Sequence, residues 1–64
     1  MKRTDLIRHL LLQGCRFKQE GGRHTLFENP KTGLFSTVPR HTVVDTYLAE
    51  KICKDLGIIK PKKK

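Results

Sequence analysis

The sequence predicts an α+β domain with the element order α-β-β-β-α, in which two helices cover one face of a three-stranded antiparallel sheet. Apolar residues recur at helical spacing near both ends of the chain and alternate with polar residues along its middle, which predicts terminal helices and central strands. Because each helix has a single apolar stripe, both stripes are most simply buried on the same face of the sheet. We expect residues 1–59 to form this one domain and residues 60–64 to form a basic, disordered tail.

The first helix is expected from about Asp5 to Gln13. Thr4 suits the N-cap position, and the carboxylate of Asp5 in the first turn complements the helix dipole. Gly14 suits the position just after the helix, where a left-handed backbone is common. Four apolar residues recur at helical spacing within it: Leu6, Ile7, Leu10 and Leu11.

Three strands are expected after this helix, at residues 15–19, 23–28 and 34–38. The first alternates apolar and polar residues, as a half-buried strand does. Residues 20–22, Glu-Gly-Gly, predict a tight turn, and residues 29–33, Asn-Pro-Lys-Thr-Gly, predict a second one. Pro39 ends the third strand because it cannot donate a ladder hydrogen bond. Two short turns between three strands predict an antiparallel meander.

The second helix is expected from about Val44 to Leu56. Its apolar stripe has i, i+4 spacing and consists of Val44, Leu48, Ile52 and Leu56. Gly57 is expected to end the helix, with Ile58 folding back on Cys53 or Ile52 as in a Schellman motif.

The chain is small and strongly basic, with 14 Lys and Arg against 6 Asp and Glu and a formal net charge of +8. Such a charge favours nucleic acid, an anionic membrane or an acidic protein as the partner. No apolar run approaches the roughly 20 residues that span a bilayer. The N-terminus enters a helical pattern that contains Arg8 and His9, which argues against a signal peptide and favours the cytoplasm.

Neither a metal nor a cofactor is expected. Cys15 and Cys53 lie in separate predicted elements without a CxxC motif, so we interpret both as reduced core thiols. The histidines and cysteines lack the spacing of zinc ligand pairs. The carboxylates are scattered along the chain, which argues against a two-metal nuclease.

The candidate functional site is the turn Gly21-Gly22-Arg23-His24. Histidine has an unperturbed pKa close to neutrality and is suited to acid–base chemistry. Glycines let another backbone or a ligand approach closely. In so basic a chain, a histidine in this position could act on a phosphodiester; it could also be only a polar residue at the edge of a hairpin.

Four segments of the chain resemble a known family in their order and spacing. The first is residues 5–8 with Gly14, and the second is Gly22-Arg23-His24 followed by residues 26–27 and 29–30. The third is residues 37–41, and the fourth is residues 49–58. They resemble the opening helix, the glycine–X–histidine hairpin, the valine–proline exit from the third strand and the closing helix of HicA, the small toxin of HicA–HicB toxin–antitoxin modules. This resemblance implies the double-stranded-RNA-binding-domain fold, the element order of which the chain shares.

The resemblance also implies a function. Members of the family are ribonucleases that cut mRNA, and the motif histidine, here His24, is their catalytic residue. It implies a HicB-type antitoxin, which we expect to be acidic, as the partner. The chain departs from many members by having Arg23 where they have serine and Thr25 where they have a second histidine. Both departures alter the surroundings of His24.

The chemistry assigns a role to each candidate residue. RNA can be cut without a metal because its 2′-OH is an internal nucleophile, and His24 is the candidate general base that takes its proton. The general acid is either His41 or water. Gly22, Arg23, Arg40 and His41 are expected to bind RNA, with Arg40 suited to a bidentate grip on phosphate. Arg23 lies on the sheet face opposite His24 if the strand is regular.

Two other functions explain the same charge. A non-catalytic RNA-binding module of the double-stranded-RNA-binding type would use the same fold and basic surface. The positive charge alone would also be explained if the chain were a small basic protein that associates with ribosomes. Only the Gly22-Arg23-His24 motif favours catalysis over these alternatives.

Overall fold

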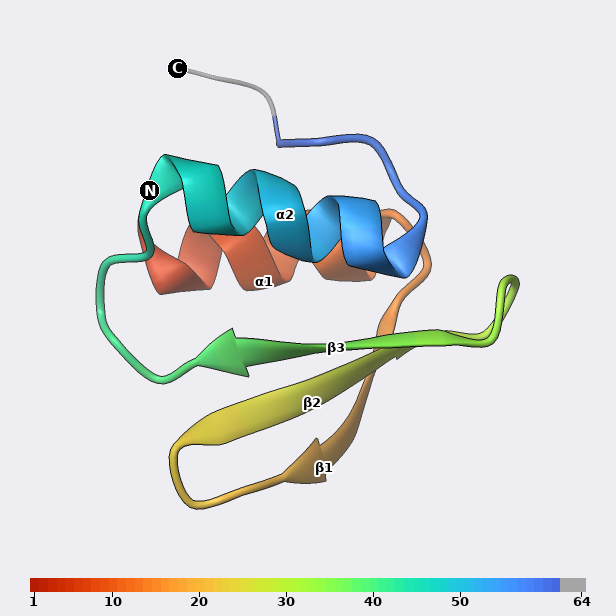
Figure 1. The fold of residues 1–64 in the computed structure, drawn as a ribbon, viewed down its shortest axis with the longest axis horizontal. Helices are drawn as coiled ribbons and strands as arrows, with labels where there is room; N and C mark the ends of the chain where they lie inside the picture. Colours follow the sequence, from red (N-terminus) through yellow and green to blue (C-terminus); the bar gives the residue numbers. More distant parts are fainter. Residues whose placement is uncertain (62–64) are drawn as a thin grey trace.

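The computed structural model describes residues 1–61 and confirms the predicted element order. The elements are α1 (Arg3–Leu12), β1 (Arg16–Glu20), β2 (His24–Asn29), β3 (Leu34–Pro39) and α2 (Thr46–Leu56). The strands form one antiparallel sheet in the order β1-β2-β3, and Figure 1 shows both helices on the same side of it. Neither helix is long and apolar enough to cross a membrane. Of the predicted tail, Lys60 and Pro61 have no regular structure, and residues 62–64 lie outside the described residues.

The start of α1 differs from the prediction. The helix begins at Arg3, Lys2 occupies the N-cap without a side-chain hydrogen bond, and Thr4 is therefore not the cap. The cause is tertiary: the first residues pair with the segment before α2, where Val44 N donates to Met1 O at 2.7 Å. Arg3 N donates to Thr42 O at 2.8 Å, so a backbone carbonyl satisfies a group that a capping side chain would otherwise serve.

The same pairing shortens α2. The sequence predicts Val44 as the first residue of α2, but Val44 lies in the extended segment before the helix. Asp45 is the N-cap, and its carboxylate accepts a hydrogen bond from Tyr47 N at 3.2 Å. At the other end the predicted Schellman motif is confirmed. Gly57 has a φ of 75°, and Ile58 N donates to Cys53 O at 3.0 Å.

The core lies between the helices and the sheet. Its buried members are Leu6, Leu10, Cys15, Phe27, Val38, Val44, Ala49, Ile52, Cys53 and Leu56. Three predicted stripe residues are not among them: Leu11 and Leu48 are exposed, and Ile7 is partly buried against the core. Cys15 and Cys53 are both buried free thiols, and burial raises both pKa values, that of Cys53 to about 11.

The sheet contains a β-bulge that the alternation of residues did not predict. Phe17 pairs with Phe27, but the next pair along is Gln19 with Leu26, so Lys18 is the extra residue in β1. Along β2, Thr25, Phe27 and Asn29 are buried beneath the helices, and the residues between them face the open side. The bulge therefore places Gln19 on the open face of the sheet and Glu20 on the helix-covered face, opposite Thr25.

Candidate active site

The turn between β1 and β2 holds His24 at the end of the sheet. Gly21 N donates to His24 O at 2.8 Å, which closes the turn. A Cβ on Gly21 would lie 3.0 Å from that same carbonyl oxygen, so a side chain there would displace one backbone or the other. Gly22 is different, because a Cβ there would meet open space. Thus Gly21 suits the close approach of the turn, whereas the missing side chain of Gly22 keeps the surface beside His24 open.

An open cleft of about 600 Å³ lies beside this turn. It is lined by Gly22, Arg23, His24, Pro39, Arg40 and His41. The cleft forms because His24 pairs with Pro39 across the sheet, which brings the segment after β3 alongside the β1–β2 turn. Figure 1 shows this turn and the β3–α2 connection at the same end of the molecule. All of the residues that we had assigned to catalysis or RNA binding thus line one cleft.

A chain of polar contacts fixes one side of the cleft. The guanidinium of Arg40 lies 2.8 Å from the carboxylate of Glu20. The other oxygen of that carboxylate accepts a hydrogen bond from the hydroxyl of Thr25 at 3.1 Å. Arg3 donates to the same hydroxyl at 2.8 Å and to the backbone oxygen of Pro39 at 2.9 Å. These contacts connect Arg40 through Glu20 in β1 and Thr25 in β2 to Arg3 in the first turn of α1.

Sequence reasoning had missed Arg3, Glu20 and Thr25. Glu20 was assigned to a turn, and Thr25 was noted only as a departure from a family pattern. A partial signal for Thr25 existed, because strand alternation places it on the same face as Phe27, and a hydroxyl on a buried face needs a hydrogen-bond partner. No such signal existed for the pairing of Glu20 with Arg40, which depends on the bulge.

A second, smaller pocket of about 270 Å³ lies on the open face of the sheet. Its lining comprises Gln19, Gly21, Gly22, Arg23, His24, Leu26 and Thr37. Gly22, Arg23 and His24 therefore line both hollows. His24 borders both the cleft and the pocket. Arg23, predicted to face away from His24 in a regular strand, lies in the turn and lines the same two hollows.

The arrangement suits acid–base chemistry beside an anion. An exposed imidazole is combined with two arginines and a second histidine, His41, in one open cleft. Among residues 1–61, no cluster of three or more His, Cys, Asp or Glu side chains is placed to hold a metal ion. The remaining histidine, His9, lies apart from the cleft on α1, where Nε2 is 2.8 Å from Ile59 O.

A family model described as the HicA toxin of bacterial toxin–antitoxin modules matches residues 3–58. The chain belongs to the HicA toxin family. The matched segment includes every helix and strand and all residues of the cleft. No curated protein and no solved structure matches the chain. Membership in the HicA family makes the protein the toxin component of a toxin–antitoxin pair, and HicA toxins are generally ribonucleases.

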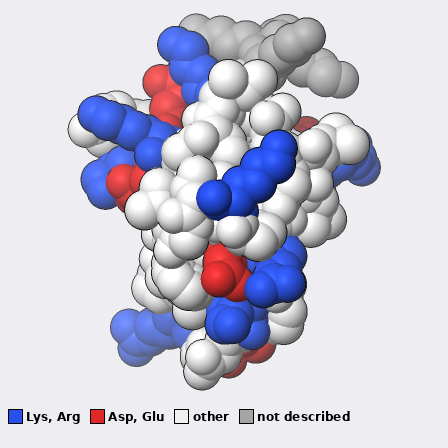
Figure 2. Space-filling model, turned by 90° about the vertical axis from the view of Figure 1, so that its right-hand side faces the viewer, with Lys and Arg blue, Asp and Glu red and all other residues white. Residues whose placement is uncertain are grey.

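The two ends of the sheet in this HicA chain carry their charged side chains in different arrangements. Figure 2 looks onto the end that carries the β2–β3 turn, opposite the cleft, and shows basic side chains dispersed among uncharged ones, with acidic side chains beside some of them. At the cleft end, Arg23 and Arg40 converge on one hollow with His24 and His41. At the cleft end, two guanidinium groups thus lie close to two imidazoles, with the Glu20 carboxylate beside Arg40.

Proposed function

We propose that this HicA-family protein is a metal-independent endoribonuclease that cuts mRNA in the cytoplasm, with His24 as its catalytic residue. The observation that carries the proposal is the position of His24. Its side chain is exposed at the meeting point of two hollows and shares the larger one with Arg23, Arg40 and His41. A histidine that served only the hairpin would need none of these neighbours.

The reaction requires removal of a proton from the attacking hydroxyl and donation of a proton to the leaving oxygen. Neutral His24 accepts the proton of the ribose 2′-OH, and the 2′-oxygen forms a bond to phosphorus while the bond to the 5′-oxygen breaks. The leaving 5′-oxygen takes a proton from His41 or from water; the place of His41 in the same cleft supports the first of these. The products are a 2′,3′-cyclic phosphate and a 5′-hydroxyl end.

Charge builds up on the phosphoryl oxygens as the 2′-oxygen attacks. Arg23 and Arg40 supply guanidinium donors in the cleft, and such donors stabilise the transition state when they are already oriented toward it. The Glu20 carboxylate and the contacts through Thr25 to Arg3 hold Arg40 in place before the substrate arrives. Glu20 is therefore a positioning residue in this proposal.

The partner that we propose is an acidic, HicB-type antitoxin that covers the cleft. Membership in a toxin–antitoxin family implies an antitoxin. The net charge of +8 favours fast association with an acidic protein. A protein lying over Gly22, Arg23 and His24 would exclude RNA and, by binding only the folded toxin, would also stabilise it.

The decisive experiment is cleavage of a single-stranded RNA by the purified protein in the presence of EDTA, with the same sequence made as DNA for comparison. The RNA should be cut, the DNA should remain intact, and the ends should be 2′,3′-cyclic phosphate or 3′-phosphate. Loss of activity in EDTA, or equal cutting of DNA, would overturn the mechanism. Tight RNA binding without cleavage would identify a non-catalytic RNA-binding module instead.

The antitoxin proposal has a separate test. Expression of the chain alone should arrest growth, and co-expression with a small acidic protein encoded beside it should restore growth. The purified complex should be inactive toward RNA. A complex that cuts RNA as fast as the free protein would contradict occlusion of the cleft.

A further inference from the structure

A row of three side chains crosses the open face of the sheet immediately beside His24. Gln19 in β1 pairs with Leu26 in β2, and Leu26 pairs with Thr37 in β3. The row therefore consists of an amide, an apolar side chain and a hydroxyl on adjacent strands. All three line the smaller pocket together with His24, which is two residues before Leu26 on the same face of β2.

The bulge in β1 creates this row. Without the bulge, regular pairing from Phe17 and Phe27 would place Lys18 opposite Leu26 and would turn Gln19 toward the helices. With the bulge, a neutral amide replaces an ammonium group at the edge of the pocket. Bulges occur frequently beside functional sites, where they redirect a side chain.

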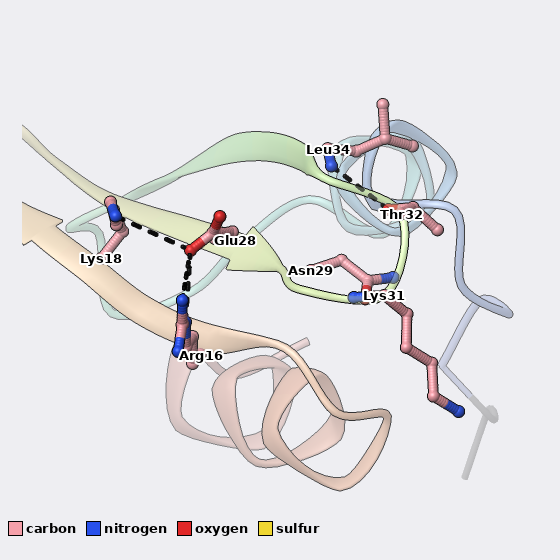
Figure 3. Close-up of polar contacts among 7 residues, drawn as sticks. All are labelled: Arg16, Lys18, Glu28, Asn29, Lys31, Thr32 and Leu34. Carbon is pink, nitrogen blue, oxygen red and sulfur yellow. Dashed lines mark hydrogen bonds and ion pairs between the residues drawn. The ribbon is translucent and has the colours of Figure 1, made fainter.

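The neighbouring row on the same face is an ion-paired cluster that lies outside the lining of the smaller pocket. There, one carboxylate oxygen of Glu28 is 3.1 Å from the Arg16 guanidinium and 3.9 Å from the Lys18 ammonium, as Figure 3 shows. These two cations thus share one carboxylate within the protein. The pocket lies between this ion-paired row and the turn that carries His24, so its own lining is neutral apart from Arg23 and His24.

Such a lining is suited to an unpaired nucleobase. The Gln19 amide offers a donor and an acceptor in one plane and can bind a base edge with two hydrogen bonds. Thr37 can donate or accept from the other side, and the half-buried Leu26 provides an apolar surface for the ring. Proteins that read RNA sequence generally bind bases of single strands in this way, because the same edges are occupied in a duplex.

We propose that Gln19, Leu26 and Thr37 form a nucleobase subsite that selects the nucleotide next to the cleaved phosphodiester. The proposal rests on the ribonuclease function proposed above. The base occupies the pocket on the open face, and the adjoining phosphate lies in the larger cleft with Arg23 and Arg40. His24 lies at the junction of the two hollows and reaches the ribose between base and phosphate. The protein consequently cuts single-stranded RNA with a preference at one flanking nucleotide.

The test compares Gln19→Ala and Thr37→Val with Gln13→Ala and Thr4→Val, which make the same changes at the C-cap and in the first turn of α1, outside both hollows. Each protein is incubated with a single-stranded RNA pool of randomised sequence, and the nucleotides around every cut are read by sequencing. The unmodified chain and both control variants should share one base preference. In the Gln19 and Thr37 variants the preference should weaken, and kcat/KM for the preferred sequence should fall roughly 5-fold for each lost hydrogen bond.

A binding measurement separates failure of the subsite from failure of the ribonuclease. In the His24→Ala background, short homopolymeric RNA oligonucleotides are titrated, and backbone NMR shifts of Gln19, Leu26 and Thr37 are followed. Base-dependent binding at these residues without cleavage by the unmodified chain would keep the subsite and reject the enzyme. Cleavage with no base preference, or a preference unchanged in Gln19→Ala and Thr37→Val, would reject the subsite and keep the enzyme.

Discussion

The two ends of β2 each carry a polar side chain, but one is buried and hydrogen-bonded and the other is exposed. Asn29, the last residue of the strand, is buried; its Nδ2 donates to Leu56 O at 2.7 Å, and its Oδ1 accepts from Lys31 N at 3.1 Å. Figure 3 shows Asn29 within the β2–β3 turn, where Thr32 Oγ1 also accepts from Leu34 N at 3.2 Å. His24, the first residue, is exposed, and its imidazole lines two hollows.

The difference shows how one strand serves structure at one end and chemistry at the other. At the Asn29 end, side-chain groups satisfy backbone groups of the turn and the last turn of α2, so few remain for a ligand. At the His24 end, the backbone closes the turn through Gly21 alone and leaves the side chains to line the cleft. Substitutions at the two ends should therefore separate activity from stability.

The largest effect is expected from His24→Ala. Loss of the general base should lower the RNA cleavage rate by about 10²- to 10⁴-fold. Because the side chain is exposed, the free energy of unfolding should change by less than about 1 kcal/mol. Single-turnover cleavage and urea denaturation provide the two measurements. Cleavage at the original rate would remove His24 from the mechanism, and unfolding of the variant would show a structural role.

Asn29→Ala should show the reverse pattern. It leaves the buried Leu56 carbonyl without its amide donor, which should lower the free energy of unfolding by about 1–3 kcal/mol. Cleavage by the folded fraction should not change. Urea denaturation and cleavage at a temperature well below the midpoint test this. A large loss of activity in a fully folded variant would mean that the two ends of β2 are not separable.

Substitution of a glycine in each of the two turns, Gly21 and Gly33, should also separate activity from stability, with smaller effects than His24→Ala and Asn29→Ala. Gly21→Ala places a Cβ 3.0 Å from His24 O, so the turn must shift and cleavage should fall by about 10-fold, since small displacements of a catalytic group are costly. Gly33→Ala, at a φ of 75°, should instead cost about 1 kcal/mol of stability with unchanged cleavage. Equal effects of both variants on kcat/KM would contradict a functional role for the β1–β2 turn and a structural role for the β2–β3 turn.

The smallest effect should appear in salt dependence. RNA binding is measured in the His24→Ala background so that the substrate persists. Removal of one phosphate contact by Arg40→Ala should reduce the slope of log K against log salt by about 0.7. Lys31→Ala, an exposed cation of the β2–β3 turn, is the control and should leave the slope unchanged. Equal slopes for the two variants would mean that phosphate binding is not concentrated at the cleft.

Much of the fold and part of the site could be predicted because both depend on local patterns. The change of period from helix to strand gave the correct element order, and Gly57 with Ile58 ended α2 as expected. Gly22, Arg23 and His24 are adjacent in sequence, so their proximity followed from one turn. Arg40 and His41 could be added because an antiparallel meander returns the end of β3 to that turn. The assignment of catalytic and binding roles to these residues stays a prediction.

The sequence by itself determined which segments are helices and strands, because periodicity is set by neighbouring residues along the chain. Only the tertiary structure decided three other features: the pairing of Met1 with Val44 in place of a Thr4 cap, the bulge at Lys18, and the contact of Glu20 with Arg40. Each is a contact between distant segments. The geometry of each contact depends on how the strands align and the helices pack, and this alignment cannot be predicted from a local sequence repeat.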